Sequence, residues 1–211
     1  MTLHAHWLSI ALPLAALYGL FLVWWGGRGK PMSPSEVEDS LQQFLKLPLT
    51  EHDRQMIPEL RRLMSTDDGN EFIMQNLVKY HKVAQYPAGS PYGEPPVSGV
   101  TADRRYGRQV LGPLLRVGSL PIFIGRRRGH LVEPEGFDEW NMVAMVRYRS
   151  RRDFLRFAYA ITRRDIAVHK WAAIEKTHVF PVNAFISLFS VRLLVGLVLL
   201  STGLLLHLFN R

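Results

Sequence analysis

Histidine is the side chain in this sequence best suited to titrate or to bind a metal near neutral pH. The candidates in the polar part of the chain are His169 and His178, with His81 and His130 behind them. No two of them have the i, i+4 or HExxH spacing by which one helix presents two ligands to a metal. Cysteine is absent, which excludes thiolate metal sites, disulfides and a cysteine nucleophile. We therefore predict no metal site, and the simplest interpretation of each histidine is a hydrogen-bonded structural residue.

Tyrosine and aspartate offer a second kind of chemistry, proton transfer. Tyr80, Tyr106 and Asp103 have side chains able to act as acid and base groups in a cleft. The Pro/Gly-rich segment 87–99 is long enough to close such a cleft as a lid or simply to connect two elements. The alternative interpretation places the tyrosines in the core and Asp103 on a helix surface. Spacing alone does not decide between these two interpretations, so the catalytic residues of a possible enzyme are unassigned at this stage.

Arginine contributes most of the formal net charge of +8. We interpret five arginines as one basic surface for an anionic ligand or for acidic lipid headgroups: Arg126, Arg127, Arg128, Arg147 and Arg149. Lipid contact would contribute about 1 kcal/mol per charge. The alternative is a solvated face with ordinary ion pairs to nearby acids, namely Glu133, Glu135, Asp138 and Glu139. No RNA-binding signature accompanies the arginines, so nucleic acid is not an expected partner.

Two apolar segments bracket everything polar. Residues 7–25 carry no charge, and at about 1.5 Å per residue they would form a helix of about 28 Å, enough to cross a hydrocarbon core of about 30 Å. A second span is predicted for residues 186–209. The alternative for the first segment is a cleaved signal peptide. We expect a retained helix, because residues 1–6 lack the basic residues of a signal peptide and no small-x-small cleavage site follows.

The charges beside the spans predict their orientation. Arg28 and Lys30 follow the first span, and Arg192 comes directly before the uncharged run 193–209 of the second. The segments on the other side of the two spans, at the ends of the chain, contain only histidines and Arg211. By the positive-inside rule the middle of the chain is cytoplasmic and both termini lie outside. Membrane lipids are then expected contacts. Small residues in the second span, Gly196 and Gly203, are typical of close helix packing within a membrane.

Between the spans the sequence predicts two regions. Residues 33–66 form a helical neck: Ser33, Pro34 and Glu36 carry the signature of a capping box, and Thr50 with Asp53 repeats it. The neck is interpreted as a spacer that packs on the domain, with a partner-docking surface as the alternative. Residues 70–182 follow the order strand, helix, strand, strand, helix, strand. The ranges are strands over 71–81, 120–124, 140–149 and 177–182, and helices over 103–117, from 150 onward, and over 165–175.

This order is that of a ferredoxin-like α+β sandwich. Three stretches make the resemblance more specific: LLRVGSLPIFIG, WNMVAMVRYRSRRDFLRF and AVHKWAAIEKTHVFP. They resemble the dimeric α+β barrel superfamily, in particular the small bacterial domains of unknown function related to antibiotic-biosynthesis monooxygenases. The strand that ends in an aromatic-basic pair before a serine and a helix is here Arg147-Tyr148-Arg149-Ser150. The resemblance covers residues 71–182, about half of the chain.

The resemblance implies a homodimer formed sheet to sheet, in a bacterial inner membrane. It also implies haem as a possible cofactor, with His169 or His178 as the ligand, because haem-binding members of the superfamily use a histidine of the domain. Three functions follow as expectations. The first is a binding or assembly module, the second a monooxygenase-like or haem-binding enzyme acting on a lipophilic substrate, and the third a subunit of a larger membrane-protein complex.

Overall fold

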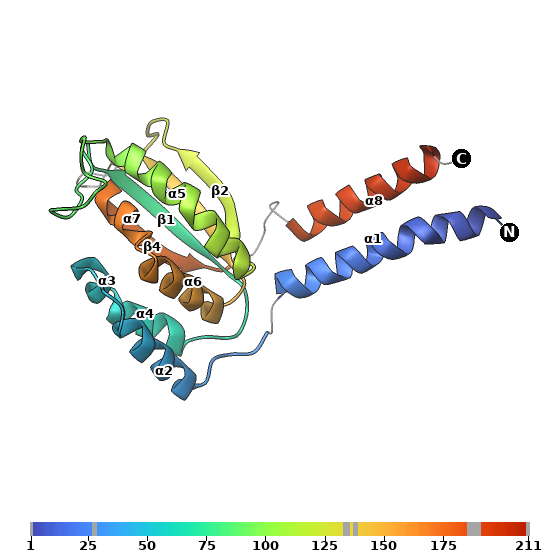
Figure 1. The fold of residues 1–211 in the computed structure, drawn as a ribbon, viewed down its shortest axis with the longest axis horizontal. Helices are drawn as coiled ribbons and strands as arrows, with labels where there is room; N and C mark the ends of the chain where they lie inside the picture. Colours follow the sequence, from blue (N-terminus) through green and yellow to red (C-terminus); the bar gives the residue numbers. More distant parts are fainter. Residues whose placement is uncertain (1, 27–28, 133–135, 137–138, 185–190, 210–211) are drawn as a thin grey trace. The chain divides into compact units, whose positions relative to one another are not determined.

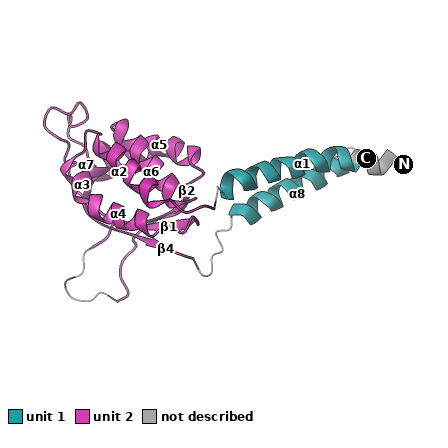
Figure 2. Cartoon of the chain, turned by 90° about the horizontal axis from the view of Figure 1, so that it is seen from below, with its two compact units in different colours: residues 1–27, 184–211 teal, residues 28–183 magenta. Residues whose placement is uncertain are grey.

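The computed structural model describes residues 2–26, 29–132, 136, 139–184 and 191–209, with the side chains of residues 2–6 left out. The chain divides into two compact units, coloured separately in Figure 2. One unit holds the two ends of the chain, residues 1–27 and 184–211, and the other holds residues 28–183. Each unit is considered by itself.

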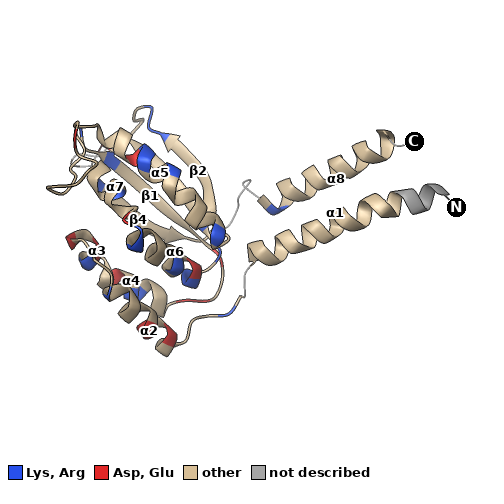
Figure 3. Cartoon of the chain, in the orientation of Figure 1, with Lys and Arg blue, Asp and Glu red and all other residues tan. Residues whose placement is uncertain are grey.

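The terminal unit is a pair of long apolar helices, α1 (Thr2–Gly26) and α8 (Val191–Phe209). Both are long and apolar enough to cross a membrane, over Trp7–Gly26 and Val191–Phe209. Charged side chains are nearly absent from their described parts, as the tan colour of Figure 3 shows. The upstream part of the predicted second span, residues 186–190, lies outside the described residues.

The two glycines of α8 contact α1. A Cβ added at Gly196 would lie 3.2 Å from the Tyr18 hydroxyl, and one at Gly203 would lie 3.0 Å from a Leu14 methyl carbon. The Tyr18 hydroxyl also donates a hydrogen bond to the carbonyl of Arg192 (3.1 Å). The small residues therefore permit close packing of α8, and its partner is the first helix of the same chain.

The other unit is built on a four-stranded antiparallel sheet (Figure 1). Its strands are β1 (Phe72–Tyr80), β2 (Leu120–Arg126), β3 (Met142–Tyr148) and β4 (Ile174–Val182). The order across the sheet is β2-β3-β1-β4. Chain order is β1, helix, β2, β3, helices, β4, so the unit is α+β, as the sequence predicts. In the register, Phe72 pairs with Tyr148 and Ile73 with Val182.

Helices cover one face of this sheet. They are α5 (Gly99–Arg116), α6 (Arg151–Arg163) and the short α7 (Ala167–Ala173). The main core joins Val110 and Leu114 of α5 and Phe157 of α6 to alternate strand residues such as Met74 and Tyr148. Alternation along a strand sends every second side chain to the same face, which is why Met74 and Tyr148 point toward the helices and their neighbours in the strands point to the other face.

The segment predicted as a helical neck forms three helices, α2 (Pro34–Leu45), α3 (Glu51–Gln55) and α4 (Ile57–Ser65). Two helices were expected, and the extra break is at Met56. Pro58 has no N–H to donate to the carbonyl four residues earlier, so the helix stops and restarts there. Leu41 and Met64 of this segment pack against Leu155 of α6, within the same compact unit as the sheet.

The starts of α5 and β4 differ from the expected ones: α5 begins at Gly99, four residues before its predicted start, and β4 begins at Ile174, three residues before its predicted start. The sequence indicates helix through residue 175, because Glu and Lys favour helices, yet α7 ends at Ala173 and β4 begins at Ile174. Strand pairing overrides local propensity here. The carbonyl of Ala173 accepts a hydrogen bond from His81 N–H (3.0 Å), Ile174 pairs with Tyr80, and Glu175 forms an ion pair with Lys79 (3.0 Å).

The second face of the sheet carries no helix among the described residues of this unit. The register assigns to it the strand positions that alternate with the core positions. Its apolar side chains, all partly or fully exposed, are Ile73, Leu77, Phe123, Val143, Met145, Phe180 and Val182. A sheet face that contacts only water usually carries mostly polar side chains. This face differs because seven apolar side chains lie on it with no helix above them among the described residues.

Candidate functional site

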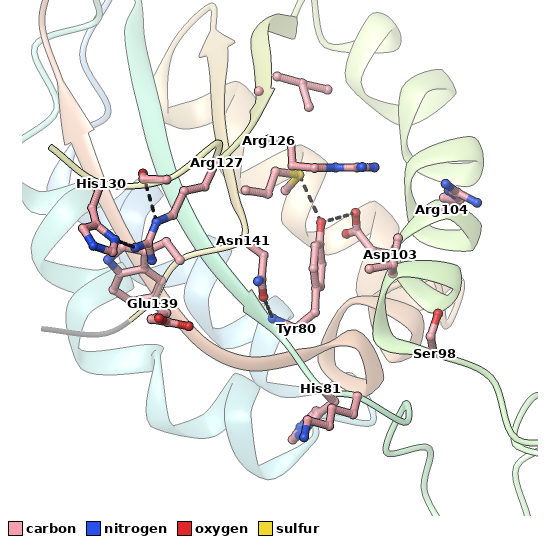
Figure 4. A pocket seen from close by; sticks show the side chains of 17 residues that line it. Tyr80, His81, Ser98, Asp103, Arg104, Arg126, Arg127, His130, Glu139 and Asn141 are labelled. Atoms are coloured by element: carbon pink, nitrogen blue, oxygen red, sulfur yellow. Dashed lines mark hydrogen bonds between the residues drawn. The ribbon is translucent and has the colours of Figure 1, made fainter.

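A cavity of about 840 Å³ opens at the end of the sheet where β1 and β2 finish and α5 begins (Figure 4). This volume falls in the range of small-molecule sites, about 300–1,000 Å³. The lining combines aromatic and apolar groups with several charged ones: Tyr80, His81, Lys82, Ser98, Val100, Asp103, Arg104, Ile124, Gly125, Arg126, Arg127, Gly129, His130, Glu139, Trp140, Asn141 and Met142.

Tyr80 and Asp103 meet inside this cavity. The Tyr80 hydroxyl donates a hydrogen bond to Oδ2 of Asp103 at 2.8 Å, and the hydroxyl oxygen lies 3.0 Å from the sulfur of Met142. Tyr80 ends β1 and Asp103 lies in the second turn of α5, so the contact joins the sheet to the helix that covers it. Two of the three residues predicted from sequence as acid–base candidates are therefore brought together.

The backbone around the pair is fixed by several hydrogen bonds. Tyr80 N–H donates to Oδ1 of Asn141 at 2.8 Å, which ties the ends of β1 and β3 together. Ser98 caps α5 by accepting from Thr101 N–H at 3.2 Å. At Gly99 the helix touches the sheet, because a Cβ there would lie 2.5 Å from the carbonyl oxygen of His81. The first turn of α5 is thus held against the strand end that carries Tyr80.

Burial shapes the proton affinity of both groups. Burial raises the pKa of Asp103 above its usual range, and the Tyr80 hydrogen bond and the charge of Lys170 oppose that rise without cancelling it. Burial, with the charge of Asp103 and the hydrogen bond to it, likewise raises the pKa of the Tyr80 hydroxyl. Tyr80 is therefore a hydrogen-bond donor at physiological pH. Asp103 is a carboxyl group whose charged form is disfavoured by its surroundings.

Three cations line the same cavity without a hydrogen bond or ion pair to any described residue. They are Lys82 after β1, Arg104 in α5 and Arg126 at the end of β2. In Figure 4 Arg126 extends past the Tyr80 hydroxyl toward α5, while Arg127 turns the other way toward His130. Arg127 donates to the carbonyl of Gly129 (3.2 Å) and contacts His130 Nδ1 (2.9 Å). Cations without a protein partner are the groups best placed to receive an anion.

Tyr106 does not reach the cavity. It packs against the core between α5 and the sheet, and burial, with the charge of Asp103, raises its pKa. Its hydroxyl therefore stays protonated at neutral pH.

His169 is a buried structural residue, 2% exposed on α7. Its Nδ1 lies 2.9 Å from the Tyr86 hydroxyl, and its ring meets that of Tyr92 edge to face at 4.5 Å. Burial, together with the nearby charge of Arg105, lowers the pKa of His169, so the imidazole is neutral at pH 7. These contacts hold the segment after β1, which carries Tyr86 and Tyr92, against α7.

His178 is exposed on β4, on the face of the sheet without helices, with its ring 4.8 Å from that of Phe180. It does not line the cavity. Among the described residues, no group of three or more His, Asp or Glu side chains is arranged to hold a metal.

Neither of the two histidines predicted as haem ligands lines the cavity. The Nδ1 of His169 is engaged by Tyr86, and the His169 ring contacts the rings of Tyr86 and Tyr92. His178 lies on an exposed strand position outside the cavity. The histidines that do line the cavity are His81 and His130.

The five arginines predicted as one basic surface lie at opposite ends of the sheet. Arg126 pairs with Met142 at one end, followed by Arg127 and the exposed Arg128, whereas Arg147 pairs with Ile73 at the other end, next to Arg149. The position of Arg126, opposite Met142, and that of Arg147 are five residues apart along β3, or about 17 Å at about 3.3 Å per residue. Three of the four acids expected as their partners, Glu133, Glu135 and Asp138, lie outside the described residues.

The arginines at the beginning of β1 are paired with acids. Arg147, 4% exposed, donates from Nε to Glu71 (3.1 Å) and from Nη1 to the carbonyl of Gly118 (2.7 Å). Arg149 donates to Asp153 at 2.7 Å. Burial by itself would raise the pKa of Asp153, but the hydrogen bond and charge of Arg149 outweigh it and lower that pKa. These guanidinium groups are held by the protein itself.

The connections to the apolar helices also leave the domain at this end of the sheet. The carbonyls of Lys30 and Pro31 accept hydrogen bonds from Arg152 at 3.0 and 3.2 Å, close to the start of α6. Val182, the last residue of β4, pairs with Ile73 near the start of β1. The cavity with Tyr80 and Asp103 is at the opposite end of the same strand.

Lys82 and Arg104 were not singled out from the sequence. Lys82 follows directly after a strand and Arg104 lies in the second turn of a helix next to Asp103. The sequence feature that could have indicated them is their position: one lies near the end of a strand and the other near the start of the next helix, and a β-α-β order brings these ends close together. Without the register, nothing indicated which charged residues share that end.

Solved structures share the fold of this chain. One is the crystal structure of the methylated RPA0582 protein, with a TM-score of 0.54 and 22% identity over 66% of this chain and 95% of that one. A second is RPA0582 from Rhodopseudomonas palustris, described as a protein of unknown function, with a TM-score of 0.53 and 21% identity over 67% of this chain and 98% of that one. No family model matches the sequence, and no curated protein matches it. The comparisons therefore establish an α+β fold shared with uncharacterised proteins.

Proposed function

We propose that this chain is a membrane-anchored binding and assembly module whose domain is of the ferredoxin-like dimeric barrel kind. The split β-α-β order with strand order β2-β3-β1-β4 supports the ferredoxin-like assignment. Two apolar helices able to cross a membrane support the anchor. The single observation that carries the assembly role is the second face of the sheet, which has no helix over it and carries apolar side chains from all four strands.

A second copy of this chain is the partner that fits this face. Leu77 and Met145 lie near its centre, on the two middle strands, and burial of such residues stabilises an interface by about 25 cal/mol per Å² of apolar surface. Pairing of two identical sheets under a twofold axis covers both apolar faces at once.

The test is the mass of the full chain in detergent micelles by light scattering. The unaltered protein should have the mass of a dimer, and Leu77→Glu should give monomers because the charge would be buried in the interface. Val179→Glu is the matched control: Val179 is an exposed residue of β4 that points to the opposite face, so the dimer should persist.

A cross-link keeps this test informative if Leu77→Glu fails to fold. The sequence has no cysteine, so Gln75→Cys introduces a single thiol on the helix-free face, and Val179→Cys does so on the other. A bifunctional maleimide should join two Gln75→Cys chains and not two Val179→Cys chains. A monomeric unaltered protein, or equal cross-linking of both variants, would contradict the proposed pairing.

The second candidate function is a monooxygenase-like enzyme acting on a lipophilic substrate at the membrane. The observation in its favour is the Tyr80–Asp103 pair in a cavity of small-molecule size. The haem-binding version is tested by the absorption spectrum of the purified protein. A Soret band lost in His178→Ala would favour it over the binding module, and a colourless protein would count against it.

A further inference from the structure

We propose that the cavity between the ends of β1 and β2 and the start of α5 is a binding site for a soluble small organic anion, one carrying a phosphate or carboxylate group on an apolar body. This ligand goes beyond the assembly role proposed above and does not depend on the pairing of sheets.

The charge of the cavity selects an anion. Among its described lining residues are four cations, Lys82, Arg104, Arg126 and Arg127, against two carboxyl groups, Asp103 and Glu139. One of those carboxyls is further discouraged from ionising, because burial raises the pKa of Asp103. The described lining therefore presents a net positive charge to a ligand.

Two of the three arginines of the cavity, Arg104 and Arg126, differ from those at the other end of the sheet in being available. Arg147 and Arg149 form ion pairs with Glu71 and Asp153. Arg104 and Arg126, in contrast, make no hydrogen bond or ion pair with the described part of the chain. A guanidinium offers two parallel N–H donors that match a carboxylate or phosphate. Figure 4 shows that Arg126 extends toward the helix that carries Arg104, so both groups border the same space.

The rest of the lining suits an organic body more than a bare ion. Val100, Ile124, Met142 and Trp140 contribute apolar surface. The Tyr80 hydroxyl is held in place by Asp103 at 2.8 Å, which supplies one oriented polar group beside that surface. Apolar walls with a few fixed polar groups are typical of small-molecule sites.

Within the domain, the cavity is at the end of β1, whereas Lys30 and Val182, which lead toward the apolar helices, lie near the start of that strand. The phosphate of a lipid headgroup would offer the same chemistry as a soluble organic phosphate. The experiment therefore distinguishes these two sources of the anion.

The experiment is a calorimetric titration of the full chain, in nanodiscs of phosphatidylcholine, with phenyl phosphate and with inorganic phosphate. Phenyl phosphate should bind, and more tightly than inorganic phosphate. Arg126→Gln and Arg104→Gln should each weaken binding of phenyl phosphate about tenfold, the usual effect of losing one charge-assisted pair of hydrogen bonds. Arg126→Lys should bind with intermediate affinity, because it keeps the charge and loses the planar fork.

Two control variants separate a built site from general attraction. Arg108 is exposed on α5 one turn after Arg104 and does not line the cavity, so Arg108→Gln should leave the affinity unchanged. Ile124→Ala should weaken phenyl phosphate and leave inorganic phosphate as it was. Light scattering on every variant should give the same mass as the unaltered chain, which keeps the ligand result separate from the assembly result.

Several outcomes would overturn the inference. They are absence of phenyl phosphate binding, a loss in Arg108→Gln as large as that in Arg104→Gln, and equal affinity for the two phosphates. Displacement of phenyl phosphate when phosphatidylglycerol replaces part of the phosphatidylcholine would overturn the assignment to a soluble ligand.

Discussion

Asp103 has a carboxyl group whose environment disfavours its charged form. A carboxyl group is favoured in water, yet this one is partly buried beside a tyrosine hydroxyl at 2.8 Å. Its usual pKa is 3.8, and burial raises it. The folded state therefore holds the proton more tightly than the unfolded chain does. Between 3.8 and the folded pKa, stability falls as pH rises, because the unfolded chain binds fewer protons there.

Replacing Asp103 with asparagine should accordingly stabilise the protein at neutral pH. Asparagine removes the charge and keeps an oxygen that accepts the Tyr80 hydrogen bond. The midpoint of thermal unfolding of Asp103→Asn should exceed that of the unaltered chain at pH 7. The gain should shrink below pH 3.8, where the aspartate is protonated in both states. Asp39→Asn, at an exposed carboxylate of α2, is the control and should change little. A lower midpoint for Asp103→Asn at pH 7 would mean that its charge is stabilised by Lys170 and Tyr80 more than burial disfavours it.

Arginines illustrate a second point at the residue scale. Composition indicates a basic protein but treats all arginines alike, and residues 126–128 together with 147 and 149 looked like one surface. Burial and hydrogen bonding distinguish these arginines. Arg147 is 4% exposed and hydrogen-bonded to Glu71, whereas Arg126 is exposed on the wall of the cavity. Only contacts between residues far apart in sequence distinguish a structural arginine from one available to a ligand.

At the scale of elements, the start of α5 positions one wall of the cavity. Gly99 N–H donates to the carbonyl of His81 at 3.1 Å, and a Cβ at Gly99 would lie 2.5 Å from that oxygen and 2.6 Å from the carbonyl oxygen of Ala173. Backbone atoms of two strand ends cannot move aside as a flexible side chain would. The first turn of the helix therefore requires glycine for close approach to the sheet.

Gly99→Ala should destabilise the domain by about 2 kcal/mol, the usual effect of overpacking a rigid site. Gly107→Ala on the same helix is the matched control, since nothing lies within 4 Å of a Cβ there. It should stabilise by about 0.5–1 kcal/mol, because alanine favours the helix over glycine. Chemical denaturation of the full chain in detergent, followed by circular dichroism, measures both. Equal effects of the two substitutions would show that α5 does not press on the sheet at Gly99.

Local signals predicted three helix starts, because capping depends on neighbours in sequence, whereas α5 begins at Gly99 and not at residue 103 as predicted. Ser33, Thr50 and Ser150 each accept a hydrogen bond from the backbone three residues on, as their capping patterns predict. The start of β4 was placed three residues late, because pairing of Ile174 with Tyr80 is a contact between distant residues. Where an element boundary is set by a partner strand, propensity is a poor guide.

At the scale of the whole molecule, two helices that are long and apolar enough to cross a membrane lie at the two ends of one chain. The Tyr18 hydroxyl and the Arg192 carbonyl are hydrogen-bonded, so the two helices are joined near the points where the polar chain leaves and returns. We propose that both helices cross a membrane and that the basic residues beside them in the sequence, Arg28, Lys30 and Arg192, lie on the same side of it. We propose that this side is the cytoplasm of a bacterium.

A pair of reporters fused after Arg211 tests that orientation. Alkaline phosphatase, which is active only outside the cytoplasm, should be active there, and green fluorescent protein, which folds only in the cytoplasm, should be dark. Fusions truncated after Lys30 contain the first span alone and should give the opposite pattern. Fluorescence from the fusion at Arg211 would show that the C-terminus is cytoplasmic and that the positive-inside interpretation is wrong.

The sequence by itself determined the apolar helices, the α+β order of the middle domain and most helix starts. Each of these depends on composition or on residues a few positions apart, which a linear pattern records. The grouping of Tyr80 with Asp103 and Arg126, the burial of His169 and the separation of the arginines were decided only by the tertiary structure. Those features depend on which strand lies beside which and on which side of the sheet a residue points, and a shift of one residue in register would reverse every such assignment.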